Sequence, residues 1–104
     1  MTDDHTNVLD VAEHSRFEVR VGGEPAGVAL YTVAPGALRF THTEIGGAYG
    51  GRGLGGTLVR GALDAARSRR LAVLPECDFM RGWIAKHPDY VDLVPADERA
   101  RFGL

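Results

Sequence analysis

Cysteine, lysine and long hydrophobic runs are scarce or missing in this chain of 104 residues. The single cysteine, Cys77, excludes a disulfide within the chain, so a reducing cytoplasm is the expected location. No apolar run approaches the ~20 residues that cross a bilayer, and the opening residues are too polar and acidic for a signal peptide. With 44% hydrophobic residues, the composition predicts a soluble globular protein without membrane contact.

Charge is nearly balanced, although almost all of the positive charge is arginine. Eleven arginines and one lysine stand against fourteen acidic residues, for a net charge of −2. That balance argues against bulk nucleic-acid binding. The length suits one domain with one core, which we expect over residues 8–94, between a frayed segment 1–7 and a polar tail 95–104. A monomer is expected, because no surplus amphipathic helix offers an interface.

Three strands are predicted in the first half of the chain. Residues 16–21 alternate between apolar and charged side chains, the period of a half-buried strand. Gly22 and Gly23 then mark a hairpin turn, and a more apolar strand follows at about 26–32. After a second turn, the third strand covers residues 37–45. These segments indicate an antiparallel sheet.

Alternation along the third strand assigns its side chains to two faces. One face carries Leu38, Phe40, His42 and Glu44. The other carries Arg39, Thr41, Thr43 and Ile45. Two ionisable groups, His42 and Glu44, are therefore expected to point the same way, immediately before a glycine-rich run.

That run, residues 50–56, leads directly into an amphipathic helix that extends to Arg67. Glycines let backbone N–H groups approach a phosphate closely, and the positive end of the helix dipole points to the same place. The pattern predicts a phosphate-bearing ligand, although neither a P-loop nor a dinucleotide motif is present. The arginines at the far end suit the negative end of the dipole; alternatively one of them, or Arg60, reaches a second phosphate.

The second half of the chain predicts a short strand at 71–74, which returns beside the third strand. Asp78 is the expected N-cap of a second helix, in which Phe79 and the other large apolar residues are expected to lie mainly in the core, and Pro88 ends that helix. Residues 89–94 are interpreted as a last short strand.

Three segments together resemble the small YjdJ-like branch of the GNAT-type N-acetyltransferases. They are Phe-Thr-His-Thr-Glu at 40–44, the glycine run with its helix, and Leu-Pro-Glu-Cys-Asp-Phe at 74–79 followed by His-Pro-Asp-Tyr at 87–90. The resemblance covers about residues 16–94. It implies a single minimal α+β domain with a mostly antiparallel central sheet, a splayed parallel strand pair and two main helices.

The same resemblance implies acetyl-CoA, or coenzyme A, as the cofactor. Its pyrophosphate would lie on the glycine loop, and its pantetheine arm would lie between the splayed strands, with the thioester near Cys77. The implied cofactor-binding residues are Ile45, Gly50, Gly51, Arg52, Gly53, Leu54, Gly55, Gly56 and Thr57. The loop departs from the superfamily pattern at Gly50, where a glutamine or arginine is usual, so backbone amides would do most of the binding.

Three side chains are candidates for the chemistry of acetyl transfer. His42 could act as a base, since histidine exchanges protons near neutral pH, or it could be a partly buried structural residue. Glu44 could act through water or orient a cationic substrate. Cys77 could carry the acetyl group, could protonate the leaving thiol, or could be an inert buried thiol. No metal is expected, because the histidines and the cysteine lack metal-ligand spacing.

The leading hypothesis is an N-acetyltransferase that acts on a primary amine. An open site in so short a chain favours a protein tail or an externally presented amine over an enclosed small molecule. One alternative is a non-catalytic module that binds or senses coenzyme A or its acyl derivatives. A structural domain without a nucleotide ligand is the least favoured.

Overall fold

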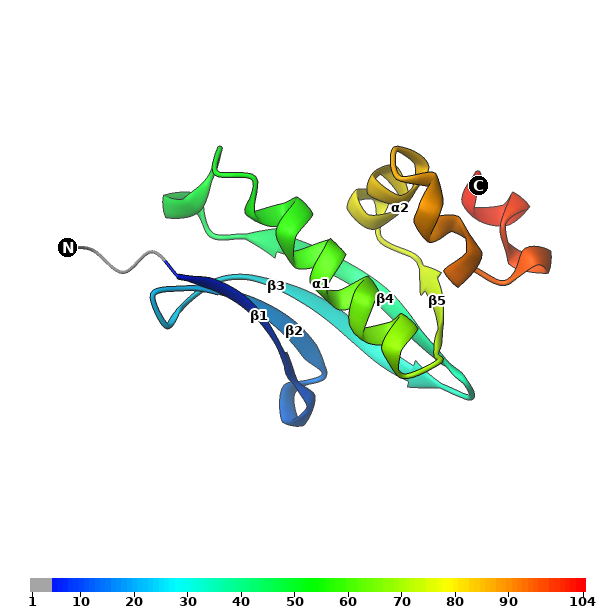
Figure 1. The fold of residues 1–104 in the computed structure, drawn as a ribbon, viewed down its shortest axis with the longest axis horizontal. Helices are drawn as coiled ribbons and strands as arrows, with labels where there is room; N and C mark the ends of the chain where they lie inside the picture. Colours follow the sequence, from blue (N-terminus) through cyan, green and yellow to red (C-terminus); the bar gives the residue numbers. More distant parts are fainter. Residues whose placement is uncertain (1–4) are drawn as a thin grey trace.

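The computed structural model describes residues 5–104, which form a five-stranded sheet and two main helices (Figure 1). The elements are β1 (Thr6–Val11), β2 (Arg16–Val21), β3 (Glu24–Ala34), β4 (Ala37–Ile45), α1 (Leu54–Ser68), β5 (Ala72–Pro75) and α2 (Asp78–Ala85). The strands lie in the order of the sequence; all neighbours are antiparallel except β4 and β5, which are parallel. The predicted α+β fold is confirmed.

The first strand was not expected. Residues 1–7 were predicted to be frayed, but Thr6 and Asn7 belong to β1; residues 1–4 lie outside the described part of the chain. β1 pairs with β2 along its whole length, with Val8 opposite Val19. On this edge strand polar residues interrupt the apolar pattern, so pairing with β2 rather than periodicity marks the strand.

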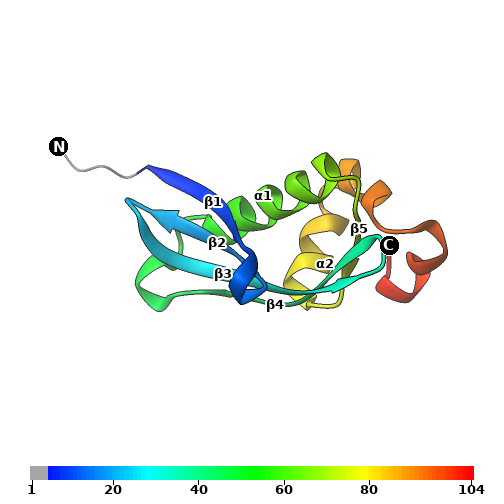
Figure 2. The ribbon, with the colours of Figure 1, turned by 90° about the horizontal axis from the view of Figure 1, so that it is seen from below.

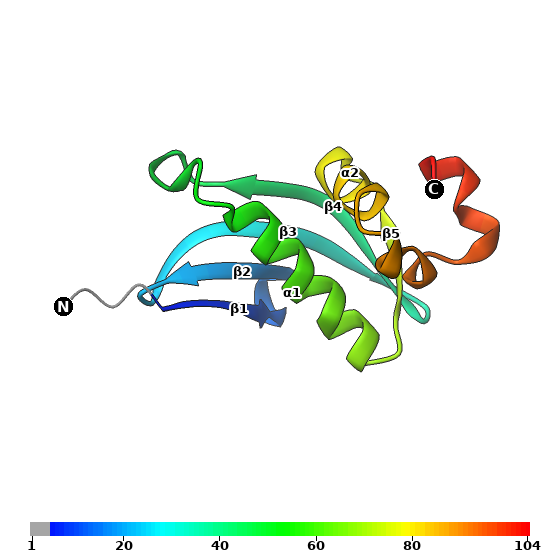
Figure 3. The same ribbon diagram turned by 45° about the horizontal axis from the view of Figure 1, so that its top comes forward.

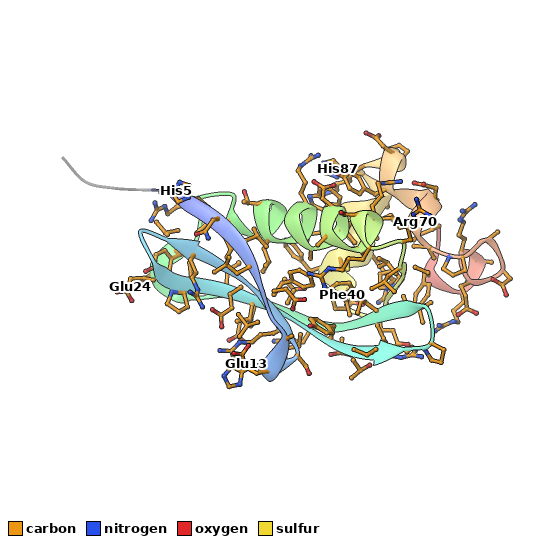
Figure 4. All side chains as sticks on the ribbon, turned by 60° about the horizontal axis from the view of Figure 1, so that its bottom comes forward. His5, Glu13, Glu24, Phe40, Arg70 and His87 are labelled. Atoms are coloured by element: carbon orange, nitrogen blue, oxygen red, sulfur yellow. The ribbon has the colours of Figure 1, made fainter. Side chains whose placement is uncertain are left out.

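Both helices lie on the same face of the sheet (Figures 2 and 4). Every third or fourth residue of α1 is apolar, and this stripe is buried against the sheet. The helix approaches β1 closely at Gly61. A Cβ atom at this position would come within 2.7 Å of the Val8 side chain. On the same face Phe17, Tyr31 and Phe40 form a cluster with ring centroids 5.6–6.0 Å apart.

The connection from β4 through α1 to β5 places the end of β4 and the N-termini of α1 and α2 in one region. α1 begins beside the end of β4 and crosses the sheet, so that β5 starts at the opposite end and returns parallel to β4 (Figure 3). α2 follows β5 and packs Met80 and Ile84, both fully buried, into the core. This arrangement brings the N-termini of both helices to the same region of the molecule.

The C-terminal part of the chain differs from the predictions. Residues 89–94 were interpreted as a strand, but Pro88–Leu93 is a 3₁₀ helix. Proline suits the first turn of a helix, and Tyr90 and Leu93, three positions apart, are both buried, as a helical turn requires. Residues 95–104, predicted as a polar tail, form two short 3₁₀ helices that bury Phe102.

Candidate active site

A cleft opens where β4 and β5 part. The parallel pairing of the two strands ends at Phe40 and Pro75. Beyond this pair the amides of Glu76 and Cys77 both donate to the Phe40 carbonyl oxygen, at 2.9 and 3.1 Å, and the chain turns into α2. Within residues 5–104, the β4 edge from Thr41 onward therefore has no strand beside it on this side.

A β-bulge at Thr41 changes the direction of the side chains along β4. On β3 the consecutive residues Leu30 and Tyr31 pair with His42 and Phe40, which leaves Thr41 as the extra residue. Because side chains alternate along a strand, one extra residue exchanges the two faces for every residue that follows. The second half of β4 therefore faces the opposite way from the prediction.

The predicted grouping of His42 and Glu44 with Phe40 is accordingly wrong. Thr43 shares the helix-covered face with Phe40, since it pairs with the buried Ala29 of β3. His42 and Glu44 lie on the open face, with side chains 55% and 70% exposed. They do point the same way, as predicted, and Nε2 of His42 is 3.3 Å from Oε1 of Glu44.

The cleft has a volume of about 340 Å³ and is mostly polar. Its lining consists of Thr41, His42, Thr43, Glu76, Cys77, Asp78 and Phe79. Inside it the Oγ1 atom of Thr43 lies 3.2 Å from Sγ of Cys77. His42 and Cys77 are thus lining residues of one cleft, although the sequence alone left open whether the fold brings them together.

Cys77 is the N-cap residue of α2 and is only 8% exposed. The prediction gave the cap to Asp78, but Asp78 is the first helical residue, and its carboxylate pairs with Arg81 in the first turn. Arg81 also donates to the Glu76 carbonyl oxygen at 2.9 Å. This arginine therefore holds the turn that presents the Cys77 thiol to the cleft.

A second cavity, of about 240 Å³, lies on the glycine loop, and we call it the cradle. Its lining consists of Ile45, Tyr49, Gly50, Gly51, Arg52, Gly53, Leu54, Gly55, Gly56 and Phe79. Gly51 and Gly53 have φ angles of +76° and +72°, which favour glycine. The loop residues predicted to bind a cofactor therefore line one cavity, with the exception of Thr57.

The cradle fits an anionic group such as a phosphate. Gly53 is the N-cap of α1 and has no side chain that could cover the amides of the first turn. The first turn also lacks an acidic residue, so its dipole charge is not offset locally. Arg52 lies on the Tyr49 ring, 5.8 Å from the centroid, and adds a positive charge to the loop.

Phe79 joins the cradle to the cleft. The prediction assigned this ring mainly to the core, but it is 47% exposed and lines both cavities. Helical periodicity does not separate it from the buried Met80, because the two are consecutive and both apolar. Sequence reasoning did not select Thr43 and Phe79 as functional, nor the further lining residues Thr41, Tyr49, Glu76 and Asp78.

The arginines of α1 and its C-cap were predicted either to suit the helix dipole or to reach a second phosphate. Near the end of the helix Arg67 pairs with Asp92, and Arg69 pairs with Asp10, at 2.8 and 2.7 Å. These pairs favour a structural role. Arg60 donates to the Tyr90 hydroxyl oxygen at 3.2 Å. It also lines a cavity of about 380 Å³ that borders the first turn of α1.

Comparison with known proteins identifies the family. Residues 16–93, which include the cleft and the cradle, match the family model described as GCN5-related N-acetyl-transferase. The chain therefore belongs to this family. The narrower resemblance to its YjdJ-like branch stays a prediction. The chain matched none of the curated proteins with which it was compared.

Two further observations concern residues 5–104 alone. None of the helices in this part is long and apolar enough to cross a membrane. No three histidine, cysteine or acidic side chains of these residues gather in a way that could hold a metal ion. The expectation that the protein uses no metal stays a prediction.

Proposed function

We propose that the protein is an N-acetyltransferase that moves the acetyl group of acetyl-CoA to a primary amine. The observation that carries this proposal is that the cradle and the Cys77 cleft share a lining residue, Phe79, and so lie next to each other. The cradle suits phosphates, and the cleft holds a thiol, a hydroxyl and an imidazole. Membership of an N-acetyltransferase family supports the same reaction class.

The cradle residues would hold the nucleotide end of the cofactor. The backbone amides of residues 50–56 would donate to the pyrophosphate, with support from the Arg52 guanidinium. Thr57 is committed to the helix, because its hydroxyl donates to the Gly53 carbonyl oxygen at 3.3 Å. Ile45 would contribute apolar contact where β4 ends. When bound, acetyl-CoA supplies a thioester whose carbonyl carbon accepts the amine.

His42 and Glu44 would handle the proton of the amine. In the transfer a C–N bond forms, the thioester C–S bond breaks, one amine proton passes to a base, and the leaving thiolate takes up a proton. His42 lies on the rim of the cleft, where an amine can reach it from the open face. Glu44, 3.3 Å away, would orient the imidazole and attract a cationic acceptor.

Cys77, whose sulfur lies 3.2 Å from the Thr43 hydroxyl oxygen, fits two roles in the transfer. In direct transfer its thiol gives a proton to the leaving thiolate. In covalent transfer its thiolate attacks the acetyl carbon, coenzyme A leaves as the thiol, and the amine then displaces Cys77 from the new thioester. The two routes differ in one observable species, acetylated Cys77.

The open face of the sheet indicates how the acceptor is presented. Among the described residues both helices cover the opposite face, and His42 and Glu44 are largely exposed. An amine carried on a protein tail or another extended molecule would reach this rim without obstruction. The acceptor we propose is therefore an externally presented primary amine.

Titration with acetyl-CoA, followed by intact mass spectrometry of the wild type and of Cys77→Ala, tests the proposal. Cofactor binding with an adduct that Cys77→Ala abolishes would establish the covalent route. Binding without an adduct, together with amide formation on a panel of lysine peptides and polyamines, would establish direct transfer. Firm binding without turnover on any amine would instead identify a binding or sensing module, and absence of binding would overturn the proposal.

A further inference from the structure

Phe79 is an unusually placed aromatic side chain. In the described part of the chain, large hydrophobic side chains exposed by more than a third are Leu9, Val33 and Phe79. Val33 lies near the turn between β3 and β4, away from the cavities, whereas Phe79 lies in the first turn of α2, two residues after Cys77. Half of a phenyl ring is thus left in water inside the candidate site.

The ring is held in place from the cradle side. A Cβ atom at Gly55 would lie 2.6 Å from Cζ of Phe79 and within 3.3 Å of both Cε atoms. The ring therefore occupies the space that any other residue at position 55 would need. Because Gly55 is in the first turn of α1, this contact fixes the ring against the cradle.

The ring also borders the cleft and a third cavity. Phe79 lines the cradle, the Cys77 cleft and a cavity of about 270 Å³ that it shares with Trp83 and Lys86. A ligand whose phosphates lie in the cradle and whose thioester lies at Cys77 has to pass this ring. The part that passes is the tether between the phosphates and the sulfur.

We propose that Phe79 is the residue that binds this tether, the pantetheine arm, and thereby makes the site selective for coenzyme A over nucleotides that lack the arm. The inference rests on the proposed function. Covering the exposed half of the ring with the methyl and methylene groups of the arm stabilises the complex by apolar burial. A nucleotide that ends at its phosphates gains nothing from the ring.

Calorimetric binding to four proteins tests the inference, with two ligands: coenzyme A, and adenosine 3′-phosphate 5′-diphosphate, which has the same nucleotide and pyrophosphate without the arm. The proteins are the wild type, Phe79→Ala, Phe79→Leu and the control Val33→Ala, which shortens an exposed apolar side chain outside the cavities. We expect Phe79→Ala to weaken coenzyme A binding about tenfold, the effect of losing a half-buried aromatic ring. Binding of adenosine 3′-phosphate 5′-diphosphate stays unchanged, Phe79→Leu recovers part of the loss, and Val33→Ala resembles the wild type.

The comparison of the two ligands separates this role from a structural one. Equal losses for coenzyme A and adenosine 3′-phosphate 5′-diphosphate would mean that the ring only supports the cradle, and would overturn the inference. Unchanged binding of both ligands would also overturn it, while the proposed function would stand. A wild type that binds neither ligand would overturn the proposed function itself. Thermal unfolding of each variant checks that α2, anchored by Met80 and Ile84, remains folded.

Discussion

The hydroxyl oxygen of Thr43 lies 3.2 Å from the sulfur of Cys77, across 34 positions of sequence. β4 supplies the hydroxyl and the N-cap of α2 supplies the thiol, so the contact joins the two sides of the cleft. A hydroxyl at this distance can donate to a thiolate and hold it in one orientation. The reactivity of Cys77 should therefore depend on Thr43.

Replacing Thr43 by valine removes the hydroxyl and keeps the shape. We expect Thr43→Val to slow alkylation of Cys77 by iodoacetamide about fivefold, which corresponds to one hydrogen bond of ~1 kcal/mol. Thr43→Ser should react as the wild type does. The rate is measured by mass spectrometry, and equal rates for all three proteins would show that the hydroxyl does not assist the thiolate.

His42→Gln should lower amine acetylation by about a hundredfold or more, the usual contribution of a general base. Affinity for acetyl-CoA should not change, because His42 lies on the open face and outside the cradle. His14→Gln, a change at an exposed histidine next to β1, is the control. A parallel loss of cofactor affinity in His42→Gln would contradict this assignment.

Alanine at Gly51 or Gly53 should destabilise the protein by about 1–2 kcal/mol, because both residues have positive φ angles. The same changes should weaken coenzyme A binding, since the loop must leave its present conformation. Gly47→Ala is a matched control, because a Cβ atom there has no heavy atom within 4 Å. Urea unfolding and calorimetry provide the two measurements, and equal effects at all three positions would count against a shaped cradle.

The buried carboxylate of Glu18 predicts a dependence of stability on pH. Glu18 is 3% exposed and receives hydrogen bonds from Arg20 at 2.8 and 3.0 Å and from Arg16 at 2.8 Å. The bonds from Arg20, with those from Arg16, hold the pKa of this carboxyl below its ordinary value of 4.5. Its stabilising effect is therefore complete above that value and is lost as the pH falls through the lowered pKa of the folded state.

Glu18→Gln should thus lower the free energy of unfolding by about 1–3 kcal/mol at neutral pH. The difference from the wild type should shrink as the pH falls below 4.5 and through the lowered pKa of Glu18, where the wild type also loses its charge. Denaturant unfolding across this range measures both effects. The exposed Glu24→Gln serves as a control, and a difference that stays constant down to acid pH would refute the ionic explanation.

Much of the fold could be predicted because its elements carry regular periods. β2 and β4 have the predicted bounds, and α1 carries the predicted apolar stripe. β1 could not be recognised in the same way, since Asn7 and Asp10 obscure its alternation and the strand depends on its partner. The 3₁₀ helix at Pro88–Leu93 was mistaken for a strand because its apolar residues Tyr90, Val91 and Leu93 also suit an extended segment.

The candidate site was less accessible to prediction. His42, Glu44 and Cys77 could be selected by residue type, but the contact of Cys77 with Thr43 depends on a bulge that leaves no mark in the residue types of β4. The role of Phe79 could not be predicted for a related reason. Exposure of an apolar ring depends on what neighbouring elements leave uncovered, and here the neighbour is a glycine in another helix.

The bulge at Thr41 divides β4 into two segments, and the alternation of inward and outward side chains is reversed between them. Before it, even-numbered positions such as Leu38 and Phe40 build the core. After it, odd-numbered positions such as Thr43 lie on the helix-covered face, and even-numbered ones lie on the open face. Deleting this one residue would restore regular alternation without removing any core side chain that precedes it. The sheet could then persist while Thr43 turned away from Cys77, which makes the site separable from the fold by a change of a single residue in length.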